Sequence, residues 1–106
     1  MFKAFTKKTG IKINVIKGSA DQLIQRLQTE GENSPADILL TVDAGRLVRA
    51  KNLGLLQPIT SPLLIKQIPS EMRDLDGYWY GLTVRARALI YSKERVKQNQ
   101  LSTYED

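Results

Sequence analysis

Residues 76–91, with the sequence DGYWYGLTVRARALIY, decide how the rest of the chain is interpreted. An Asp-Gly turn signal comes first, three adjacent aromatic residues follow, and the apolar run 82–91 then predicts a strand. Arg85 and Arg87 interrupt this run two positions apart, so in a strand they point to the same side. A buried unpaired charge is very costly. This side of the strand therefore either meets solvent or acidic partners, or lines a cleft that receives an anion, a phosphate or a metal-bound oxygen.

The composition excludes several classes of site. The chain has 106 residues, the length of one small domain, and it contains neither cysteine nor histidine. A disulfide framework, a Cys/His zinc site and a Ser-His-Asp triad therefore cannot be built from it. Any metal ion would need carboxylate, phenolate or carbonyl oxygens, which suit hard ions. Because the carboxylates are dispersed and no base accompanies a nucleophile, the sequence predicts that the protein is not an enzyme.

The net charge of +5 is compatible with an acidic partner. The basic residues are spread along the chain, and no single block or helical stripe collects them, which argues against a nucleic-acid partner. A small basic nucleic-acid-binding domain stays open as an alternative. No apolar run is long enough to cross a membrane, and the opening residues lack the apolar middle of a signal peptide. Taken alone, these two observations indicate the cytoplasm.

Helical and strand patterns alternate along the first half of the chain. Helices are expected over 1–9, 19–31 and 43–53, and strands over 11–16 and 37–42. Such alternation predicts an α/β fold with a mostly parallel sheet flanked by helices. Ligands of open sheets of this kind bind beyond the carboxyl ends of the strands.

Several residues carry local signals for helix ends. Ser19 and Gln22 have the spacing of a capping box. Asp43 directly follows the strand 37–42, and two interpretations of it stay open: the cap of the next helix, which is favoured, and a ligand-binding residue at that helix start. Pro62 opens a short helix. Later patterns predict a helical turn over 70–74, a polar helical segment over 92–96, a polar connection over 97–100 and a second capping box over 102–105.

Six stretches, in their order along the chain, together resemble one family: the periplasmic iron(III)-binding proteins of bacterial ABC importers, in the branch that uses several tyrosine ligands. The stretches are FTKKTGIKINV (5–15), SPADILLTVDAGRL (34–47), GLLQP (54–58), WYGLTVRAR (79–87), YSKE (91–94) and LSTYED (101–106). Any one of them would be weak evidence alone, and their ordered set carries the resemblance.

The resemblance implies a type II periplasmic-binding-protein fold with two lobes in a Venus-flytrap arrangement, considerably longer than this chain. Residues 1–84 would form most of the first lobe without its first strand. Residues 85–106 would form the crossover strand and the start of the second lobe. The chain is therefore expected to be part of a longer protein that is periplasmic and monomeric, which reverses the cytoplasmic indication.

The family's function, by this resemblance, is to capture ferric iron in the cleft between the lobes and to pass it to a membrane permease. Arg85 matches the cleft arginine that balances phenolate charge or holds a synergistic anion such as carbonate, whereas Arg87 is assigned a structural role. A glutamate ligand of another branch is replaced here by Val42. No metal ligand is expected within this chain, because the family's ligand tyrosines do not match its own tyrosines, which are Tyr78, Tyr80, Tyr91 and Tyr104.

Two alternatives to this function stay open. The chain could belong to a related binding protein for another anionic solute, such as an organic acid or a phosphate ester. It could also be the small basic nucleic-acid-binding domain considered above. Tyr78 and Tyr80 are interpreted as packing residues in each case.

Overall fold

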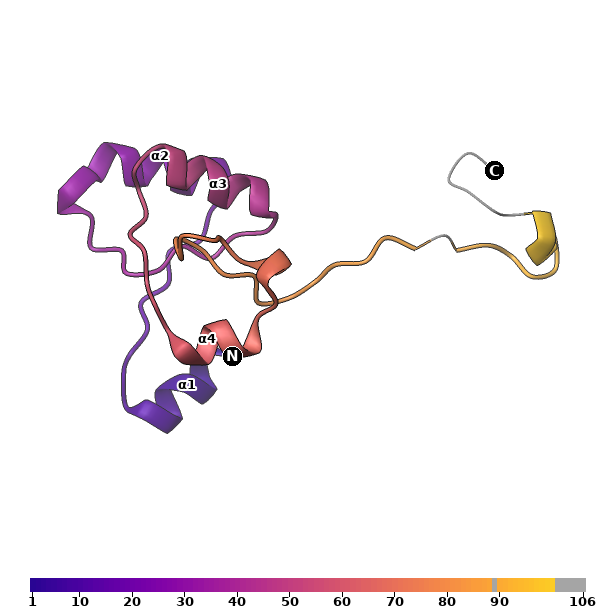
Figure 1. Ribbon diagram of the computed structural model, residues 1–106, viewed down its shortest axis with the longest axis horizontal. Coiled ribbons are helices and arrows are strands. Elements are labelled where there is room, and N and C mark those ends of the chain that lie inside the picture. Colours follow the sequence, from indigo (N-terminus) through magenta and orange to yellow (C-terminus); the bar gives the residue numbers. More distant parts are fainter. Residues whose placement is uncertain (89, 101–106) are drawn as a thin grey trace.

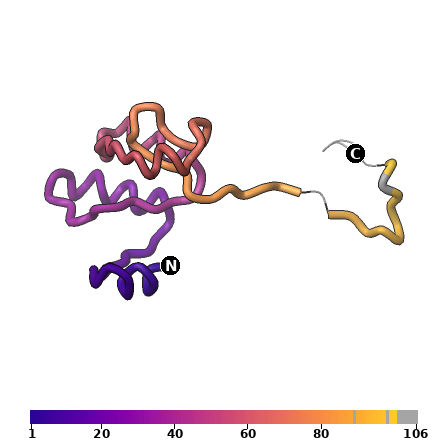
Figure 2. Tube along the Cα trace, turned by 60° about the horizontal axis from the view of Figure 1, so that its bottom comes forward, coloured from indigo at the N-terminus to yellow at the C-terminus, as the bar shows by residue number. Residues whose placement is uncertain are grey.

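The computed structural model describes residues 1–88 and 90–100, and all regular secondary structure in this part of the chain is helical. The elements, in order, are α1 Phe2–Thr9, α2 Ala20–Glu30, η1 Gly31–Asn33, α3 Ala44–Asn52, α4 Pro62–Gln67, η2 Ser70–Met72 and η3 Gln98–Gln100. Figure 1 shows α2 and α3 on one side of a body formed by residues 1–81, with α1 and α4 on the opposite side. Residues 82–88 and 90–100 extend from this body as an arm, as Figures 1 and 2 both show.

The helices form where the sequence carries local start and stop signals. At the start of α2, Ser19 Oγ accepts a hydrogen bond from the Gln22 N–H at 3.3 Å, and the Gln22 side-chain oxygen accepts one from the Ser19 N–H at 3.1 Å. This is the predicted capping box. Gly10 ends α1 in the left-handed region with φ 72°, as predicted. Ser61 and Pro62 begin α4, and η2 lies within the predicted turn over 70–74.

The core among the described residues is small. It consists of Ile24 on α2, Ala50 on α3 and Ile68 after α4, all less than a tenth exposed. Helices α2 and α3 pack against each other, and their facing small and branched side chains form the centre of this core. The arrangement fixes the start of α3 beside the start of α2, which is where the candidate site lies.

The predicted strands are absent from the described part of the chain. Segments 11–16, 37–42 and 82–88 have irregular backbone. The pairing recorded among the described residues is one isolated antiparallel bridge between Arg73 and Tyr80. A strand needs hydrogen-bond partners from another segment, and these three segments find none in this structure, so the expected sheet is not seen.

The surface area shows the consequence of the missing sheet. The accessible surface is 9625 Å², whereas a compact monomer of this mass exposes about 6,000 Å². The radius of gyration is 19.0 Å, compared with about 13 Å for a compact domain of this length. Ile38 and Val84, both expected on strands, are 84% and 70% exposed. The structure therefore leaves uncovered the apolar surface that a sheet would bury.

Two further predictions about the arm need correction. Residues 92–96 form turns rather than the expected helical segment, and η3 occupies most of the stretch 97–100 that was predicted as a polar connection. Backbone hydrogen bonds to the Ser92 carbonyl close the first of these turns without extending into a helix. The capping-box pattern over 102–105 lies outside the described residues.

Candidate functional site

Arg85 leaves the body where the arm begins and lies beside the start of α3. Its Nη2 is 3.4 Å from Asp43 Oδ1, although the two residues are 42 positions apart in the chain. The Arg85 side chain is 71% exposed. The structure thus brings together the two residues that the sequence suggested for ligand binding, and it leaves the guanidinium group accessible to an anion from solvent.

Asp43 stands at the N-cap position of α3 but does not cap the helix with its side chain. Its carboxylate instead binds two arginines: Oδ1 faces Arg85, and Oδ2 accepts a hydrogen bond from Arg46 Nη1 at 3.2 Å. The interpretation of Asp43 as a side-chain cap is therefore wrong, because two cations compete for the carboxylate. Its φ of 67° is the one positive value among the described non-glycine residues, a conformation that costs about 1–3 kcal/mol.

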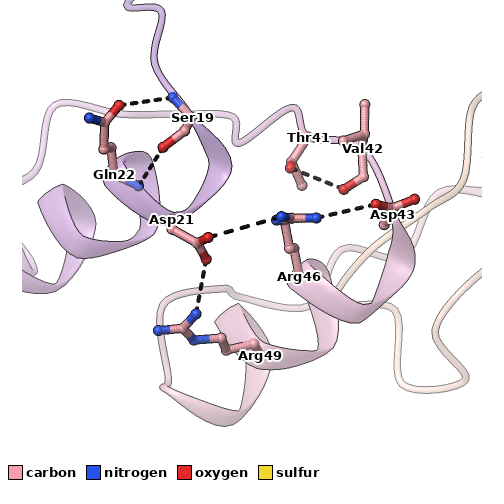
Figure 3. A network of polar contacts seen from close by, with 8 residues as sticks. All are labelled: Ser19, Asp21, Gln22, Thr41, Val42, Asp43, Arg46 and Arg49. Atoms are coloured by element: carbon pink, nitrogen blue, oxygen red, sulfur yellow. Dashed lines mark hydrogen bonds and ion pairs between the residues drawn. The ribbon is translucent and has the colours of Figure 1, made fainter.

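The contacts continue from Asp43 toward α2 as a chain of alternating charges, which we call the ion-pair chain; its members are Arg85, Asp43, Arg46, Asp21 and Arg49. Figure 3 shows the part of it from Asp43 to Arg49. Arg46 Nη2 lies 4.0 Å from Asp21 Oδ2, and Arg49 Nη1 lies 3.0 Å from Asp21 Oδ1. Asp21 is in the first turn of α2, where a negative charge is favoured by the helix dipole. With three arginines and two aspartates, the ion-pair chain carries an excess positive charge.

The ion-pair chain is better suited to binding an anion than to stabilising the fold. The side chains of its members are 38–71% exposed, and exposed pairs contribute only about 0–1 kcal/mol each. Arg46 Nε is buried and has no hydrogen-bond partner among the described residues. An arginine held by weak, exposed pairs can exchange a carboxylate for an incoming oxyanion at little cost, because the fork of donors fits planar oxygens.

A metal site is not assembled within the part of the chain that the structure describes. No group of three or more acidic side chains lies close enough to hold a metal ion there. Tyr78 lies under Lys51, whose Nζ is 4.8 Å from the ring centre, and the Tyr80 hydroxyl donates to the Ile59 carbonyl at 2.5 Å. These contacts support the interpretation of both tyrosines as packing residues.

Lys51 forms a second charged cluster that closes the loop between η2 and residue 81. Its Nζ lies 2.9 Å from an oxygen of Asp74 and 2.9 Å from an oxygen of Asp76. The hydrogen bond from Lys51 lowers the pKa of Asp74, with the Tyr78 N–H adding to the effect. The same bonds, first to Asp74 and then to Asp76, raise the pKa of Lys51. This cluster ties the end of α3 to the turn before the arm and so helps to fix where Arg85 begins.

Sequence reasoning found the first two members of the ion-pair chain, Arg85 and Asp43, and missed the other three. Arg46 lies three residues after Asp43 on the same helix, a spacing at which opposite charges meet, so this contact could have been found. Asp21 joins from another helix, and no sequence signal links it to Arg46. Arg87 is exposed, and no ion pair involves it among residues 1–88 and 90–100, so its structural role stays a prediction.

Comparisons with known proteins agree on one family. Residues 1–106 match the family described as bacterial extracellular solute-binding protein. The chain is 50% identical over 106 residues to Iron uptake protein A1 of Synechocystis, covering 100% of this chain and 29% of that protein. It is 33% identical over 97 residues to the Fe(3+)-binding periplasmic protein of Serratia marcescens, covering 92% of this chain and 28% of that protein.

Solved structures give the same picture. A Trichodesmium protein (IdiA, FutA) in complex with iron and citrate ligands matches with a TM-score of 0.88 at 51% identity, over 99% of this chain and 33% of its own. Iron-bound HitA from Pseudomonas aeruginosa matches with a TM-score of 0.80 at 35% identity. The match covers 95% of this chain and 33% of HitA. The chain thus spans about a third or less of the length of these proteins, and the resemblance to ferric-binding proteins is confirmed.

Proposed function

The chain belongs to the bacterial extracellular solute-binding protein family, and on this basis we propose that it forms part of the substrate-binding component of an ABC importer for ferric iron. One observation carries the proposal: over its full length the chain is half identical to a protein named for iron uptake. The solved structures that it matches include proteins described with bound iron. A periplasmic location follows from the same proposal, since a relative is named as a periplasmic protein.

We propose that residues 1–84 form most of one lobe of a type II two-lobed fold and that residues 85–106 begin the crossing to the other lobe. In this arrangement segments 11–16 and 37–42 become strands of a mostly parallel sheet, completed by parts of the fold that this chain does not span. The exposed apolar side chains on these segments support the proposal, because they need a covering layer that the described residues do not supply.

Arg85 would supply a permanent positive charge beside the iron. Ferric iron bound by phenolates and an oxyanion leaves excess negative charge in the cleft, and a guanidinium group offsets it without any proton transfer. Citrate accompanies iron in the Trichodesmium structure, and a carboxylate of this kind, or carbonate, fits the donor fork of Arg85. Asp43 would hold Arg85 at 3.4 Å until the anion arrives and then release it.

The iron ligands themselves would come from outside this chain. Tyr78 and Tyr80 are engaged in contacts with Lys51 and Ile59, and the described residues provide no group of three or more acidic side chains that could hold the metal. We therefore expect the isolated 106-residue chain to bind ferric iron weakly. Transfer of the iron to a membrane permease and a monomeric state are further parts of the proposal.

A chimera tests this function. The corresponding stretch of Synechocystis Iron uptake protein A1, which is 29% of that protein, would be replaced by residues 1–106. Ferric iron would then be titrated while the visible charge-transfer absorbance of iron-bound tyrosinate is followed, with the unaltered Synechocystis protein in parallel. Binding within about tenfold of the parent supports the proposal. A folded chimera that binds no iron while the parent does would overturn it.

The same chimera tests the alternative of another anionic solute. Thermal unfolding would be followed with citrate, phosphate and carbonate in the absence of iron. Stabilisation by one of these anions, together with no response to ferric iron, would favour a binding protein for an organic or inorganic anion.

A further inference from the structure

The carboxylate of Asp43 lies between two guanidinium groups. One of its oxygens, Oδ1, is 3.4 Å from Arg85 Nη2, and the other, Oδ2, is 3.2 Å from Arg46 Nη1. A single planar oxyanion thus contacts two arginines, with a separate oxygen for each. A free carboxylate or a carbonate ion has the same planar oxygens and suits the same donors. In this structure the oxyanion between the two arginines belongs to the chain itself.

Arg46 is the more firmly placed of the two arginines. Its side chain is 38% exposed, compared with 71% for Arg85. It stands on α3 four residues before Ala50, which is completely buried. Figure 3 shows its guanidinium group between Asp21 and Asp43, so Arg46 has a second acidic neighbour if Asp43 moves away. Arg85, in contrast, reaches this position from the arm.

Arg46 also has donors that the described residues leave unused. Its Nε is buried and has no hydrogen-bond partner there. Its Nη2 is 4.0 Å from Asp21 Oδ2, which is too long for a hydrogen bond. A buried donor without an acceptor is unfavourable, and an oxyanion that supplies further oxygens would relieve it.

Asp43 has another position available when an anion replaces it. It stands at the N-cap of α3, where an aspartate side chain usually accepts a hydrogen bond from the first turn, and no such bond is formed here. Once released from the arginines, the carboxylate can cap the helix, and the backbone can leave its φ of 67°. Because the ion pairs are exposed and weak, these gains favour the exchange.

From this geometry we propose that Asp43 occupies the place of the synergistic anion in the empty site, and that Arg46 is a second residue that binds this anion together with Arg85. The inference rests on the function proposed above and names the anion as a carboxylate or carbonate group with one oxygen on each arginine. Asp43 competes with this anion and is displaced toward the start of α3 when it binds. The bound anion then links α3 to the segment that begins the proposed crossing between the lobes.

The test uses the chimera described above, stripped of iron, and measures anion binding by isothermal titration calorimetry. Arg46→Gln removes the second arginine, and Asp43→Asn keeps the shape of the competing side chain without its charge. The matched controls are Arg26→Gln and Glu30→Gln, which make the same charge changes in another exposed pair, with 2.6 Å between Arg26 Nε and Glu30 Oε1. Circular dichroism and thermal unfolding check that each variant is folded.

The two site variants should change anion affinity in opposite directions. Arg46→Gln should bind citrate and carbonate at least about tenfold more weakly than the unaltered chimera, because a hydrogen bond between charged groups is lost. Asp43→Asn should bind both at least about threefold more tightly, because a competitor lowers the apparent affinity by the fraction of molecules that it blocks. Misfolding does not produce such a gain. Each control should stay within about twofold of the unaltered chimera.

Four outcomes would overturn the proposal. Unchanged affinities in Arg46→Gln would remove the second arginine from the site. No gain in Asp43→Asn, or an equal gain in Glu30→Gln, would mean that Asp43 does not compete with the anion. Tighter binding of tetrahedral phosphate than of citrate and carbonate would exclude a planar oxyanion as the preferred ligand. An unaltered chimera that binds none of the three anions would leave no anion site.

Titration of ferric iron into the same preparations separates this proposal from the function on which it rests. A chimera that binds iron but shows none of the expected anion effects would overturn the roles of Arg46 and Asp43 and leave the proposed function standing. A chimera that shows these anion effects but binds no iron would leave the two-arginine site standing and overturn the ferric iron function.

Discussion

The guanidinium group of Arg85 meets the carboxylate of Asp43 at 3.4 Å, and this contact joins the start of the arm to the start of α3. Through Arg46 and Asp21 the same contact reaches α2, so Arg85 is linked to the starts of two helices. Because the pair is exposed, it positions Arg85 without holding it tightly.

Replacing Arg85 by glutamine in the chimera should weaken ferric iron binding about ten- to a hundredfold, since a hydrogen bond to a charged group is worth about 1.5–3 kcal/mol. The measurement is the charge-transfer titration described above. Arg87→Gln is the matched control, because it removes an exposed cation two positions away and should change affinity less than about twofold. An equal loss of iron affinity in the two variants would show that Arg85 acts only through the net positive charge of the chain.

The backbone strain at Asp43 can be measured separately from the contribution of its carboxylate. Asp43→Gly and Asp43→Ala both remove the ion pairs, but only glycine adopts the φ of 67° without strain. The glycine variant should therefore be more stable than the alanine variant by about 1 kcal/mol. Urea unfolding of the 106-residue chain, followed by circular dichroism, measures the difference. A more stable alanine variant would mean that this residue relaxes out of the left-handed region.

The capping box of α2 should contribute measurably to stability. Ser19→Ala removes the acceptor of the Gln22 N–H and is expected to lower the free energy of unfolding by about 1 kcal/mol. Ser70→Ala, at the first residue of η2, is the control and should stay within about 0.5 kcal/mol of the parent. A loss at Ser70 as large as that at Ser19 would contradict the local origin of the effect.

The Lys51–Asp74 contact predicts how stability depends on pH. Lys51 lowers the folded-state pKa of Asp74 below the ordinary carboxyl value of about 3.9. The contact therefore stabilises the folded chain above that value, and the stabilisation is lost as the pH falls through the folded pKa. For Lys51 the sign is opposite: its raised pKa stabilises the folded chain below about 10.4, and this is lost as the pH rises through the raised value.

Lys51→Met removes the hydrogen-bond donor of Asp74, so the stability of the variant should fall less steeply as the pH is lowered. The measurement is the urea midpoint of unfolding as a function of pH. Lys66→Met is the control, because Lys66 is exposed and makes no ion pair in the described part of the chain. A profile for Lys51→Met that falls as steeply as that of the parent would mean that another carboxylate controls the acid transition.

Two glycines should respond to alanine in opposite directions. A Cβ added at Gly81 would lie 2.7 Å from the Met72 carbonyl oxygen, so Gly81→Ala should destabilise the chain by about 1–3 kcal/mol. A Cβ at Gly45, in the first turn of α3, meets nothing within 4 Å, and Gly45→Ala should stabilise the chain by about 0.5–1 kcal/mol. Thermal unfolding distinguishes the two effects, and a destabilised Gly45→Ala would contradict the open space seen there.

The sequence by itself determined α1, α2, α3 and α4, because their start and stop signals act within a few residues. Ser19 with Gln22, and Ser61 with Pro62, predicted where α2 and α4 begin, and Gly10 predicted where α1 ends. The ordered motifs also identified the family, since they depend on residue identity and not on packing. Arg85 was singled out for the same reason, whereas Asp43 was singled out by its position between a predicted strand and a predicted helix.

Only the tertiary structure decided which distant segments and side chains these residues contact. Segments 11–16 and 37–42 have the composition of strands and were predicted as strands, but a strand forms only with a partner segment, and the described residues supply none. Asp43 occupies the N-cap position of α3, but its carboxylate accepts hydrogen bonds from Arg46 and Arg85 instead of from the helix backbone. A hydrogen bond within one turn can be predicted from spacing, whereas a contact between residues 42 positions apart depends on how the chain folds back on itself.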